Sequence, residues 1–343
     1  MSVQTIGLLT SGGDSPGTNA AVESAARRIW ERGGRALGVR EGFRGLIDGL
    51  ITELRPEQID GIGAHGGSFL KTSRDARIGQ DDGRERARGV LRQAGVDGLV
   101  VCGGRGSIAL GVARLMECDV RVVALPCTID NDIPHTEASI GFDSACNKAV
   151  SLLEAIRETG RAMGGRFFVV ETLGGDTGFI ALETAYGAWA DAVIVPEFEF
   201  DLQRVAGRIR SAVEARGYGI LVVSEGTGHA QQFTDALQTL LGVRGRATAL
   251  GHSQRGGPPS MRDRFLGRSL GTFAAEMVMC GESGVMAGMH EGAPSLVTIP
   301  RVAADTRRLD VRRYQEVNGL EDPPRMSIQK NPSGTSQPDR RSP

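Results

Sequence analysis

The chain has 343 residues, 40% of them hydrophobic and 24% charged, and its 40 lysines and arginines nearly balance its 41 aspartates and glutamates. A formal net charge of −1 argues against binding to nucleic acid or to an anionic membrane, since both need a basic face, and the length is sufficient for two domains, each with its own core. The five cysteines are scattered without C-x-x-C spacing, which argues against a disulfide framework or a zinc site and favours a reducing compartment.

The first residues, MSVQTIGLLTSGGD, contain neither the basic start nor the apolar stretch of a signal segment. No apolar run reaches about 18 residues, the length that a transmembrane helix needs. We therefore expect a cytoplasmic protein that contacts no membrane.

Short apolar runs bounded by glycine alternate with helical patterns along the chain, which is typical of a parallel sheet with helices on both faces. The predicted strands are Thr5–Thr10, Gly98–Cys102, Val120–Leu125, Phe167–Glu171, Ala192–Val195 and Gly219–Val223. The predicted helices are Asn19–Arg32, Ser107–Met116, Lys148–Glu158, Leu202–Arg216, with Asp201 as its N-cap, and Arg262–Cys280. The fold class is therefore α/β, in two lobes, each a mostly parallel sheet flanked by helices.

Ligands of such sheets bind beyond the carboxyl ends of the strands, and two glycine-rich turns stand there. TSGGDSPGTNAA (10–21) lets backbone N–H groups approach a phosphate, although it has neither the P-loop pattern nor the dinucleotide fingerprint. GGRGS (103–107) has glycines that admit a phosphate chain, and we expect Ser107 to cap the helix that follows. The alternative for GGRGS is an ordinary tight turn.

Two further segments carry ionisable groups. PCTIDNDI (126–133) places Asp130 and Asp132 two residues apart, so that in extended backbone both carboxylates face one cleft, one as a base and one near a hard cation. Two aspartates that merely form a turn are the alternative. RATALGHSQRGG (246–257) presents Arg246, His252 and Arg255 around glycines, a set that suits a phosphomonoester dianion, whereas a lone histidine is more often structural.

Three more segments belong with these motifs: GGSFLKTSR (66–74), IGFDSA (140–145) and VVET-x-G (169–174). Together they stand in the order and spacing found in the phosphofructokinase family, which the chain resembles from about residue 3 to 300. TIDND together with GH-x-QRGG is a highly specific pair. The resemblance implies a donor lobe, residues 1–141 with about 256–302, and a sugar-phosphate lobe, residues 142–255 with about 303–325. The polar tail 326–343, rich in proline and serine, is predicted to be disordered.

The resemblance also implies an activity, the transfer of a phosphoryl group from ATP or pyrophosphate to the C1 hydroxyl of fructose 6-phosphate or a related ketose phosphate, assisted by Mg²⁺. Asp130 matches the base, Thr128 a contact of the transferred group and Asp132 a ligand of the metal. Arg74 and Gly13 match residues at the phosphoryl donor. The remaining donor-binding residues that the resemblance implies are Gly104, Arg105, Gly106 and Ser107.

For the sugar phosphate, the resemblance assigns Glu225 to the ring hydroxyls and both His252 and Arg255 to the 6-phosphate. Arg166 and Arg246 match arginines that reach the sugar phosphate of a neighbouring subunit, so a homo-oligomer, a tetramer or a dimer, is expected. The sugar pocket itself is assigned to Leu173, Gly174 and Gly175.

The chain departs from the family at several of these positions. Arg105 replaces an acidic residue that faces the metal and the donor phosphates, and it either binds donor phosphate itself or leaves a sugar-phosphate-binding protein without catalysis. Gly106 is the residue of ATP enzymes, whereas Cys127 matches neither the glycine of ATP enzymes nor the lysine of pyrophosphate enzymes. Between Ser107 and Gly111 there is one residue more than in the usual motif.

Two observations concern other functions that the chain could have, a kinase for a different acceptor and an oxidoreductase. Leu173 and Gly175 replace a methionine and an arginine of the sugar pocket, which permits a different acceptor, such as one of a specialised biosynthetic pathway. A dinucleotide oxidoreductase is disfavoured, because no strand leads into a G-x-G-x-x-G pattern with an acidic residue about 20 positions on.

Overall fold

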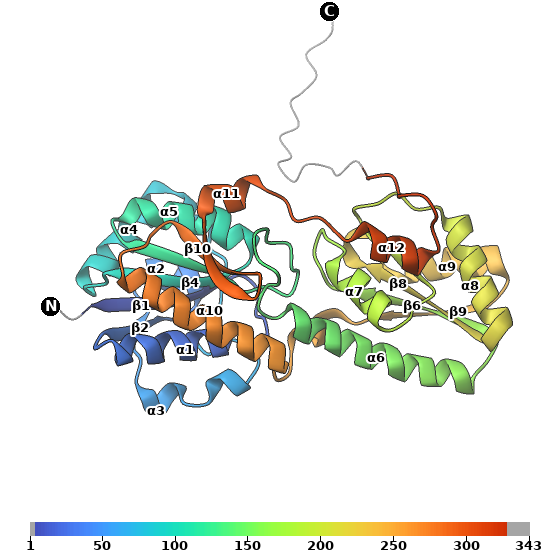
Figure 1. Cartoon of the computed structure of the whole chain (residues 1–343), viewed down its shortest axis with the longest axis horizontal. Helices are drawn as coiled ribbons and strands as arrows, with labels where there is room; N and C mark the ends of the chain where they lie inside the picture. The colour runs from blue at the N-terminus through green and yellow to red at the C-terminus, as the bar shows by residue number, and fades with distance from the viewer. Residues whose placement is uncertain (1–3, 328–343) are drawn as a thin grey trace, which may run out of the picture.

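Two bodies of secondary structure lie side by side in the computed structural model, which describes residues 4–327 (Figure 1). The first body is built around a sheet of seven strands in the order β11-β10-β5-β4-β1-β2-β3, and the second around four strands in the order β7-β8-β6-β9. The fold class expected from the sequence is confirmed: both sheets are mostly parallel and both are flanked by helices.

The seven-stranded sheet is parallel except at its edges, where β3 and β11 run antiparallel to their neighbours. Its central strands are buried on both faces: Leu8 and Val100 pack on one side, Leu9 and Val101 on the other, which is the period of two that a strand imposes. The strands are β1 (Thr5–Ser11), β2 (Arg35–Val39), β3 (Ile51–Glu53), β4 (Gly98–Gly103), β5 (Arg121–Pro126), β10 (Val285–His290) and β11 (Ala293–Thr298).

Helices from distant parts of the chain cover this sheet. One face is covered by α1 (Thr18–Glu31) and α10 (Met261–Met279), with the short α3 (Pro56–Ile59) packed near them. The two long helices approach closely because small residues face each other: a Cβ on Gly271 would lie 2.3 Å from the hydroxyl oxygen of Ser24. On the other face lie α2 (Gly42–Ile47), α4 (Asp81–Gln93), α5 (Ala113–Leu115) and α11 (Ile299–Ala304).

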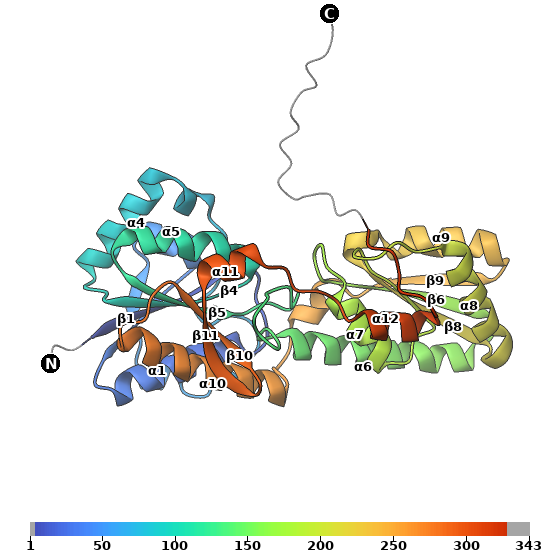
Figure 2. The same cartoon turned by 45° about the horizontal axis from the view of Figure 1, so that its top comes forward.

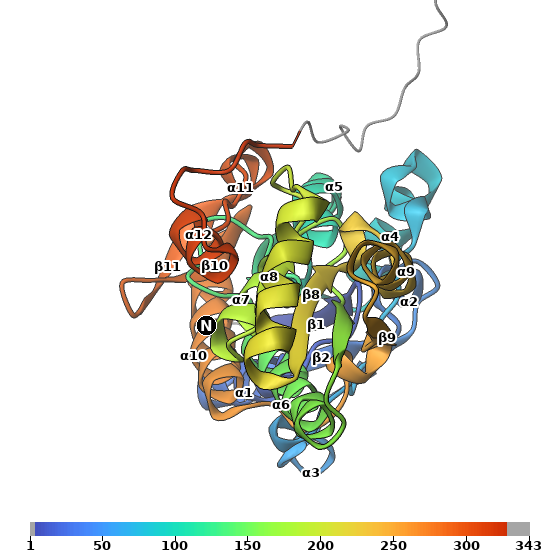
Figure 3. The ribbon, with the colours of Figure 1, turned by 90° about the vertical axis from the view of Figure 1, so that its right-hand side faces the viewer.

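The four-stranded sheet is parallel throughout, and Figure 3 shows the molecule from this end. Phe167 and Phe168 are adjacent in β6 and belong to the cores on its two opposite faces. The strands are β6 (Arg166–Thr172), β7 (Ala192–Ile194), β8 (Tyr218–Ser224) and β9 (Arg244–Ala249). One face is covered by α6 (Phe142–Ala162), α7 (Phe179–Gly187) and α12 (Val311–Asn318), the other by α8 (Leu202–Arg216) and α9 (Ala230–Leu241).

The chain passes between the two bodies three times, between β5 and α6, between β9 and α10, and between α11 and α12 (Figures 1 and 2). The last passage, residues 305–310, is named here the crossover segment. Within residues 4–327 no helix is long and apolar enough to span a membrane.

All six predicted strands form, and the predicted helix Leu202–Arg216 is present with Asp201 as its N-cap, accepting a hydrogen bond from the backbone N–H of Gln203 at 2.8 Å. The helix predicted at Ser107–Met116 is wrong in type, because it begins with a π-helical turn over Ser107–Val112. The segment 246–257, where no strand is predicted, is partly strand, since Arg246 belongs to β9.

The prediction that the chain is disordered from residue 326 onward is wrong for its first two residues. Met326 forms a β-bridge with Phe198, and the backbone N–H of Ser327 donates to the carbonyl of Glu197 at 2.9 Å. Backbone pairing with the second body therefore orders these two residues. The rest of the predicted tail, 328–343, lies outside the described residues.

Candidate functional site

The carboxyl ends of β1, β4 and β5 meet at one edge of the large sheet, and a cavity of about 620 Å³ opens there. Its walls come from the turns that follow the three strands, from residues 74–79, and from Arg255 of the second passage. The residues expected at the site that line it are Gly13, Arg74, Gly104, Arg105, Gly106, Ser107, Thr128, Asp130, Asp132 and Arg255.

The loop after β5 brings both aspartates to this cavity, but its backbone is not the extended chain that the sequence suggested. Asn131, between them, has a φ of 55°, in the left-handed region. Its side-chain oxygen accepts a hydrogen bond from the backbone N–H of Ser139 at 2.9 Å, and the Ser139 hydroxyl donates to the carbonyl of Thr128 at 2.7 Å. The far end of the loop thus fixes the turn that carries Asp130 and Asp132.

Asp130 is the carboxylate best placed for proton transfer. Its Oδ1 atom is buried and has no hydrogen-bond partner among the described residues, which leaves it available to a substrate hydroxyl. Burial raises the pKa of Asp130 above its ordinary value, and the positive charge of Arg255 opposes that shift. The negative charge of Glu225 contributes to raising the same pKa.

Charged neighbours of both signs act on the pKa of Asp132. Burial, followed by the negative charge of Asp130, raises the pKa of Asp132 to about 6, against the opposing charges of Arg105 and Arg307. Among residues 4–327 no group of three or more histidine, cysteine or acidic side chains could hold a metal ion. Mg²⁺ is commonly held by one or two carboxylates together with substrate phosphates, so Asp132 fits an ion that arrives with a phosphate ligand.

Arg105 is half-buried at the start of the turn after β4 and extends toward the crossover segment. One of its terminal N–H groups donates to the carbonyl of Asp305 at 3.3 Å, and the Asp305 carboxylate lies 2.6 Å from the Nε2 atom of His135. A guanidinium has five N–H donors, so Arg105 retains capacity for an anion in the cavity.

Arg255, expected at the sugar phosphate, lies against the first glycine-rich turn. Its Nη1 atom donates to the carbonyl of Asp14 at 3.2 Å, and a Cβ added to Gly13 would lie 2.5 Å from that nitrogen. The glycine at position 13 therefore makes room for the guanidinium. The side chain of Arg74, which also lines the cavity, is exposed.

Ser107 does not cap a helix, contrary to the expectation from sequence. Its hydroxyl donates to the hydroxyl of Ser11 at 3.0 Å and so joins the ends of β4 and β1. A π-helical turn, Ser107–Val112, follows, and turns of this kind are frequent at functional sites. Leu110, 72% exposed, lines the cavity with Phe43 and Ile78 and gives it an apolar end.

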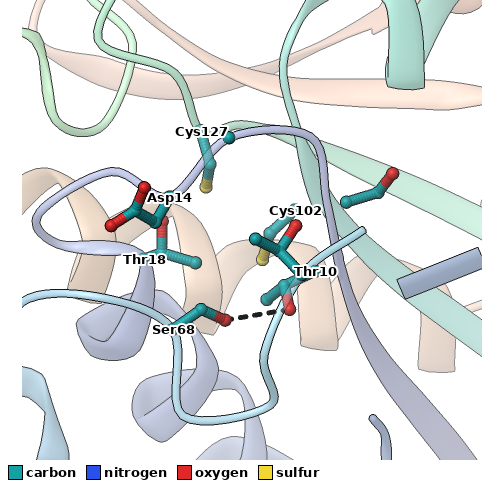
Figure 4. A pocket seen from close by; sticks show the side chains of 9 residues that line it. Thr10, Asp14, Thr18, Ser68, Cys102 and Cys127 are labelled. Carbon is teal, nitrogen blue, oxygen red and sulfur yellow. Dashed lines mark hydrogen bonds between the residues drawn. The ribbon is translucent and has the colours of Figure 1, made fainter. Parts of the chain in front are cut away.

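A second, very small cavity lies beneath the first glycine-rich turn (Figure 4). Cys127 and Cys102 point into it, and burial raises the pKa of the Cys127 thiol, so that this cysteine stays protonated. At its other side the hydroxyls of Thr10 and Ser68 lie 3.0 Å apart, and Thr10 also donates to the carbonyl of Lys71 at 2.6 Å. These contacts fasten the segment that carries Arg74 to the end of β1.

A second group of expected residues lies at the carboxyl end of β6. One carboxylate oxygen of Glu225 accepts hydrogen bonds from the backbone N–H groups of Gly174 at 2.9 Å and Gly175 at 2.7 Å. The backbone N–H of Leu173 donates to the side chain of Gln254 at 2.7 Å, which joins this group to the turn that carries Arg255.

Seven of the expected residues do not line the cavity: the four at the carboxyl end of β6 (Leu173, Gly174, Gly175 and Glu225) and three others, Arg166, Arg246 and His252. Arg166 begins β6 and Arg246 is within β9, paired in register with Phe168, so both lie away from the carboxyl end of β6. His252 is exposed in the turn after β9. The sequence also missed several residues near the site: Phe43, Ile78, Leu110, Asp305 and Arg307. The first three are ordinary apolar residues, and the last two come from a segment remote in sequence.

Comparison with known proteins identifies relatives over nearly the whole chain. Residues 5–278 match the family model described as Phosphofructokinase. The chain is 35% identical to the ATP-dependent 6-phosphofructokinase of Clostridium acetobutylicum, over 93% of this chain and 99% of the relative. It is 38% identical to the ATP-dependent 6-phosphofructokinase of Pediococcus pentosaceus, over 84% of this chain and 90% of the relative.

Solved structures show the same fold. Phosphofructokinase of Pichia pastoris in the T-state superposes with a TM-score of 0.81 at 27% identity, covering 89% of this chain and 36% of the longer Pichia chain. A pyrophosphate-dependent phosphofructokinase from Marinobacter aquaeolei superposes with a TM-score of 0.80 over 95% of this chain and 97% of its own. Its identity of 19% makes it a likeness of fold alone.

Proposed function

The chain belongs to the phosphofructokinase family, and we propose that it is a sugar-phosphate kinase that transfers a phosphoryl group from ATP to the C1 hydroxyl of fructose 6-phosphate. The observation that carries this proposal is the free, buried Oδ1 atom of Asp130 in a cavity walled by glycine-rich turns and arginines. A carboxylate so placed is suited to accept the proton of an attacking hydroxyl. ATP-dependent 6-phosphofructokinases as relatives support the substrates.

In this mechanism the chain mainly positions the two substrates and neutralises the negative charge of the phosphoryl group. Asp130 takes the proton of the C1 hydroxyl as the oxygen attacks, and Thr128 contacts the transferred group. Arg74 and Arg105 line the same cavity and stabilise the negative charge that develops on the phosphoryl oxygens, and Arg255, which also lines it, binds the 6-phosphate of the sugar. Positioning and electrostatic stabilisation are the main requirements of phosphoryl transfer, so this set of groups is sufficient in kind.

Asp132 would hold Mg²⁺ together with the donor phosphates. When bound, the ion neutralises charge on those phosphates. With a pKa of about 6, Asp132 is largely ionised at neutral pH and available as a ligand. Arg105 adds a fixed positive charge beside it. Whether this arginine takes part in catalysis or abolishes it is tested below by whether the chain turns over its substrates.

We propose that the first body, residues 1–141 with about 256–302, binds the donor and that the second, residues 142–255 with about 303–325, binds the sugar phosphate. The apolar end of the cavity, formed by Phe43, Ile78 and Leu110, supports ATP over pyrophosphate, because a base and ribose use apolar surface that pyrophosphate lacks. Gly174 and Gly175 with Glu225 would bind the sugar ring.

Arg166 and Arg246 enter the proposal through a second subunit, whereas His252 is proposed to bind the 6-phosphate of the sugar. The two arginines lie away from the cavity of their own chain, and we propose that they reach the sugar phosphate of a neighbouring subunit in a dimer or tetramer. Analytical ultracentrifugation of the full chain with and without fructose 6-phosphate tests this, and a monomer that retains full activity contradicts it.

The function is tested by following phosphorus NMR spectra of the purified chain with Mg²⁺, either ATP or pyrophosphate, and a panel of ketose phosphates. Turnover of fructose 6-phosphate with ATP is expected, and Asp130→Asn should reduce it by about 10²- to 10⁴-fold, the usual contribution of a general base. Asp235→Asn, an exposed change on α9, is the matched control. Sugar-phosphate binding without turnover from any donor would support the non-catalytic alternative, and turnover of another ketose phosphate would redefine the acceptor.

A further inference from the structure

Arg307 lies in the crossover segment, the part of the chain that runs from α11 of the first body to α12 of the second (Figures 1 and 2). Its side chain returns toward the loop that follows β5. The guanidinium donates through Nη1 to the carbonyl of Thr136 at 2.6 Å and to that of Ile133 at 3.4 Å, and through Nη2 to the carbonyl of Glu137. One side chain thus binds three backbone carbonyls between residues 133 and 137 of this loop.

The same guanidinium also contacts the second body. Its central carbon lies 5.6 Å from the ring centroid of Phe179, the first residue of α7. A planar guanidinium can stack on an aromatic face while its edges donate hydrogen bonds, which an ammonium cannot do in the same geometry. Arg307 therefore joins the loop after β5 to a helix of the other body.

Two residues of the loop have left-handed backbone, and external contacts add to what holds them there. Asn131 has a φ of 55° and His135 a φ of 61°, in a region that is uncommon for residues other than glycine although asparagine and histidine adopt it more often than most. Conformations of this kind persist only where the surroundings hold them. Near His135 those surroundings come from the crossover segment, through Arg307 and through Asp305, whose carboxylate lies 2.6 Å from the His135 ring nitrogen.

We propose that Arg307 is a positioning residue, which holds the loop bearing Asp130 and Asp132 in its reactive conformation and fixes that loop relative to the second body. The kinetic part of this proposal rests on the proposed function, whereas the structural part does not. Since the acceptor is proposed to bind to the second body, Arg307 sets the position of the base relative to both substrates.

The kinetic test compares Arg307→Met, Arg307→Lys and the control Arg308→Met in the full chain. Arg308 is the exposed neighbour in the same segment. Arg307→Met should lower kcat by about 10- to 100-fold, because a loop displaced by about 1 Å costs this much, while KM for both substrates stays within about threefold. Arg307→Lys keeps the charge without the fork and should fall between Arg307→Met and the unmodified chain, and Arg308→Met should match the unmodified chain.

Hydrogen exchange of backbone amides supplies a readout that needs no turnover. Peptides covering residues 128–141 should exchange about tenfold faster in Arg307→Met than in the unmodified chain, with Arg308→Met unchanged. If Arg307→Met does not fold, Arg307→Lys is used instead, and its peptides 128–141 must exchange faster than those of the unmodified chain, by less than about tenfold. Unchanged exchange there, or a kcat within twofold of the unmodified chain, overturns the proposal. If the unmodified chain has no kinase activity, the proposed function fails, and the exchange experiment still decides whether Arg307 holds the loop.

Discussion

Replacing Arg105 with glutamine separates two ways in which this arginine can act. Its positive charge holds down the pKa of Asp132, which burial and the charge of Asp130 raise to about 6. Removing a neighbouring cation raises the pKa of a carboxylate further, because the ionised form loses its stabilisation. At an effective dielectric constant between that of protein and water, one such charge shifts the pKa by roughly one unit.

That shift determines the pH dependence of the variant. With a pKa of about 6, Asp132 is about nine-tenths ionised at pH 7, whereas with a pKa near 7 it is about half ionised. If ionised Asp132 is needed and Arg105 acts only through it, Arg105→Gln should lose about half of its activity at pH 7 and almost none at pH 8.5. The acid limb of kcat/KM should move upward by about one pH unit.

Direct binding of donor phosphate by Arg105 gives a different profile. A hydrogen bond to a charged group contributes about 1.5–3 kcal/mol, so its loss should raise KM for ATP by about 10- to 100-fold at every pH. The assay is initial-rate kinetics from pH 5.5 to 9, with Arg114→Gln as the control because Arg114 lines the same cavity and pairs with Glu117 at 2.9 Å. An acid limb and a KM that both remain unchanged in Arg105→Gln would refute the reasoning.

Further predictions concern stability and donor choice. Gly271→Ala should destabilise the fold by about 1–3 kcal/mol in urea unfolding, because the new Cβ would lie 2.3 Å from the hydroxyl oxygen of Ser24. Gly207→Ala on α8 should instead stabilise the fold by up to about 1 kcal/mol, because no heavy atom lies within 4 Å of its new Cβ. Asp201→Ala should cost about 0.5–2 kcal/mol, since it removes the N-cap hydrogen bond of α8, and an unchanged unfolding midpoint would contradict that role. Leu110→Ala should raise KM for ATP and leave any use of pyrophosphate unaffected, so an equal effect on both donors would remove Leu110 from a base-binding surface.

The sequence predicted the central strands well because burial on both faces leaves a clear apolar run. The edge strand β9, with the sequence RGRATA, has a polar and half-exposed pattern that does not predict a strand. The hairpin of β10 and β11 carries only a weak sequence signal: Glu291 and Gly292 connect the strands with φ values of 50° and 74°, and of the two only the glycine is a residue that such a turn favours.

The site was predictable to the extent that it follows from the ends of parallel strands. Asp130 and Asp132 were identified from their place after β5, although the left-handed Asn131, rather than an extended backbone, turns both toward the cavity. Arg307 was not predictable, because it acts on carbonyls about 170 residues away, at Thr136 and Glu137. Backbone acceptors leave no mark in a sequence pattern, so contacts of this kind appear only once the fold is known.

The charge balance of the cavity explains how an arginine at position 105 is compatible with activity. An acidic residue there would place a third carboxylate beside Asp130 and Asp132, whose pKa values are already raised, and the site would depend on a cation to bind a polyphosphate. Arg105 changes the charge at that position by two units and supplies part of the cation's electrostatic effect from the protein itself. The same guanidinium favours the ionised form of Asp132. The arginine therefore keeps Asp132 ionised and adds a phosphate-binding group, which is why we favour recruitment of Arg105 over loss of catalysis.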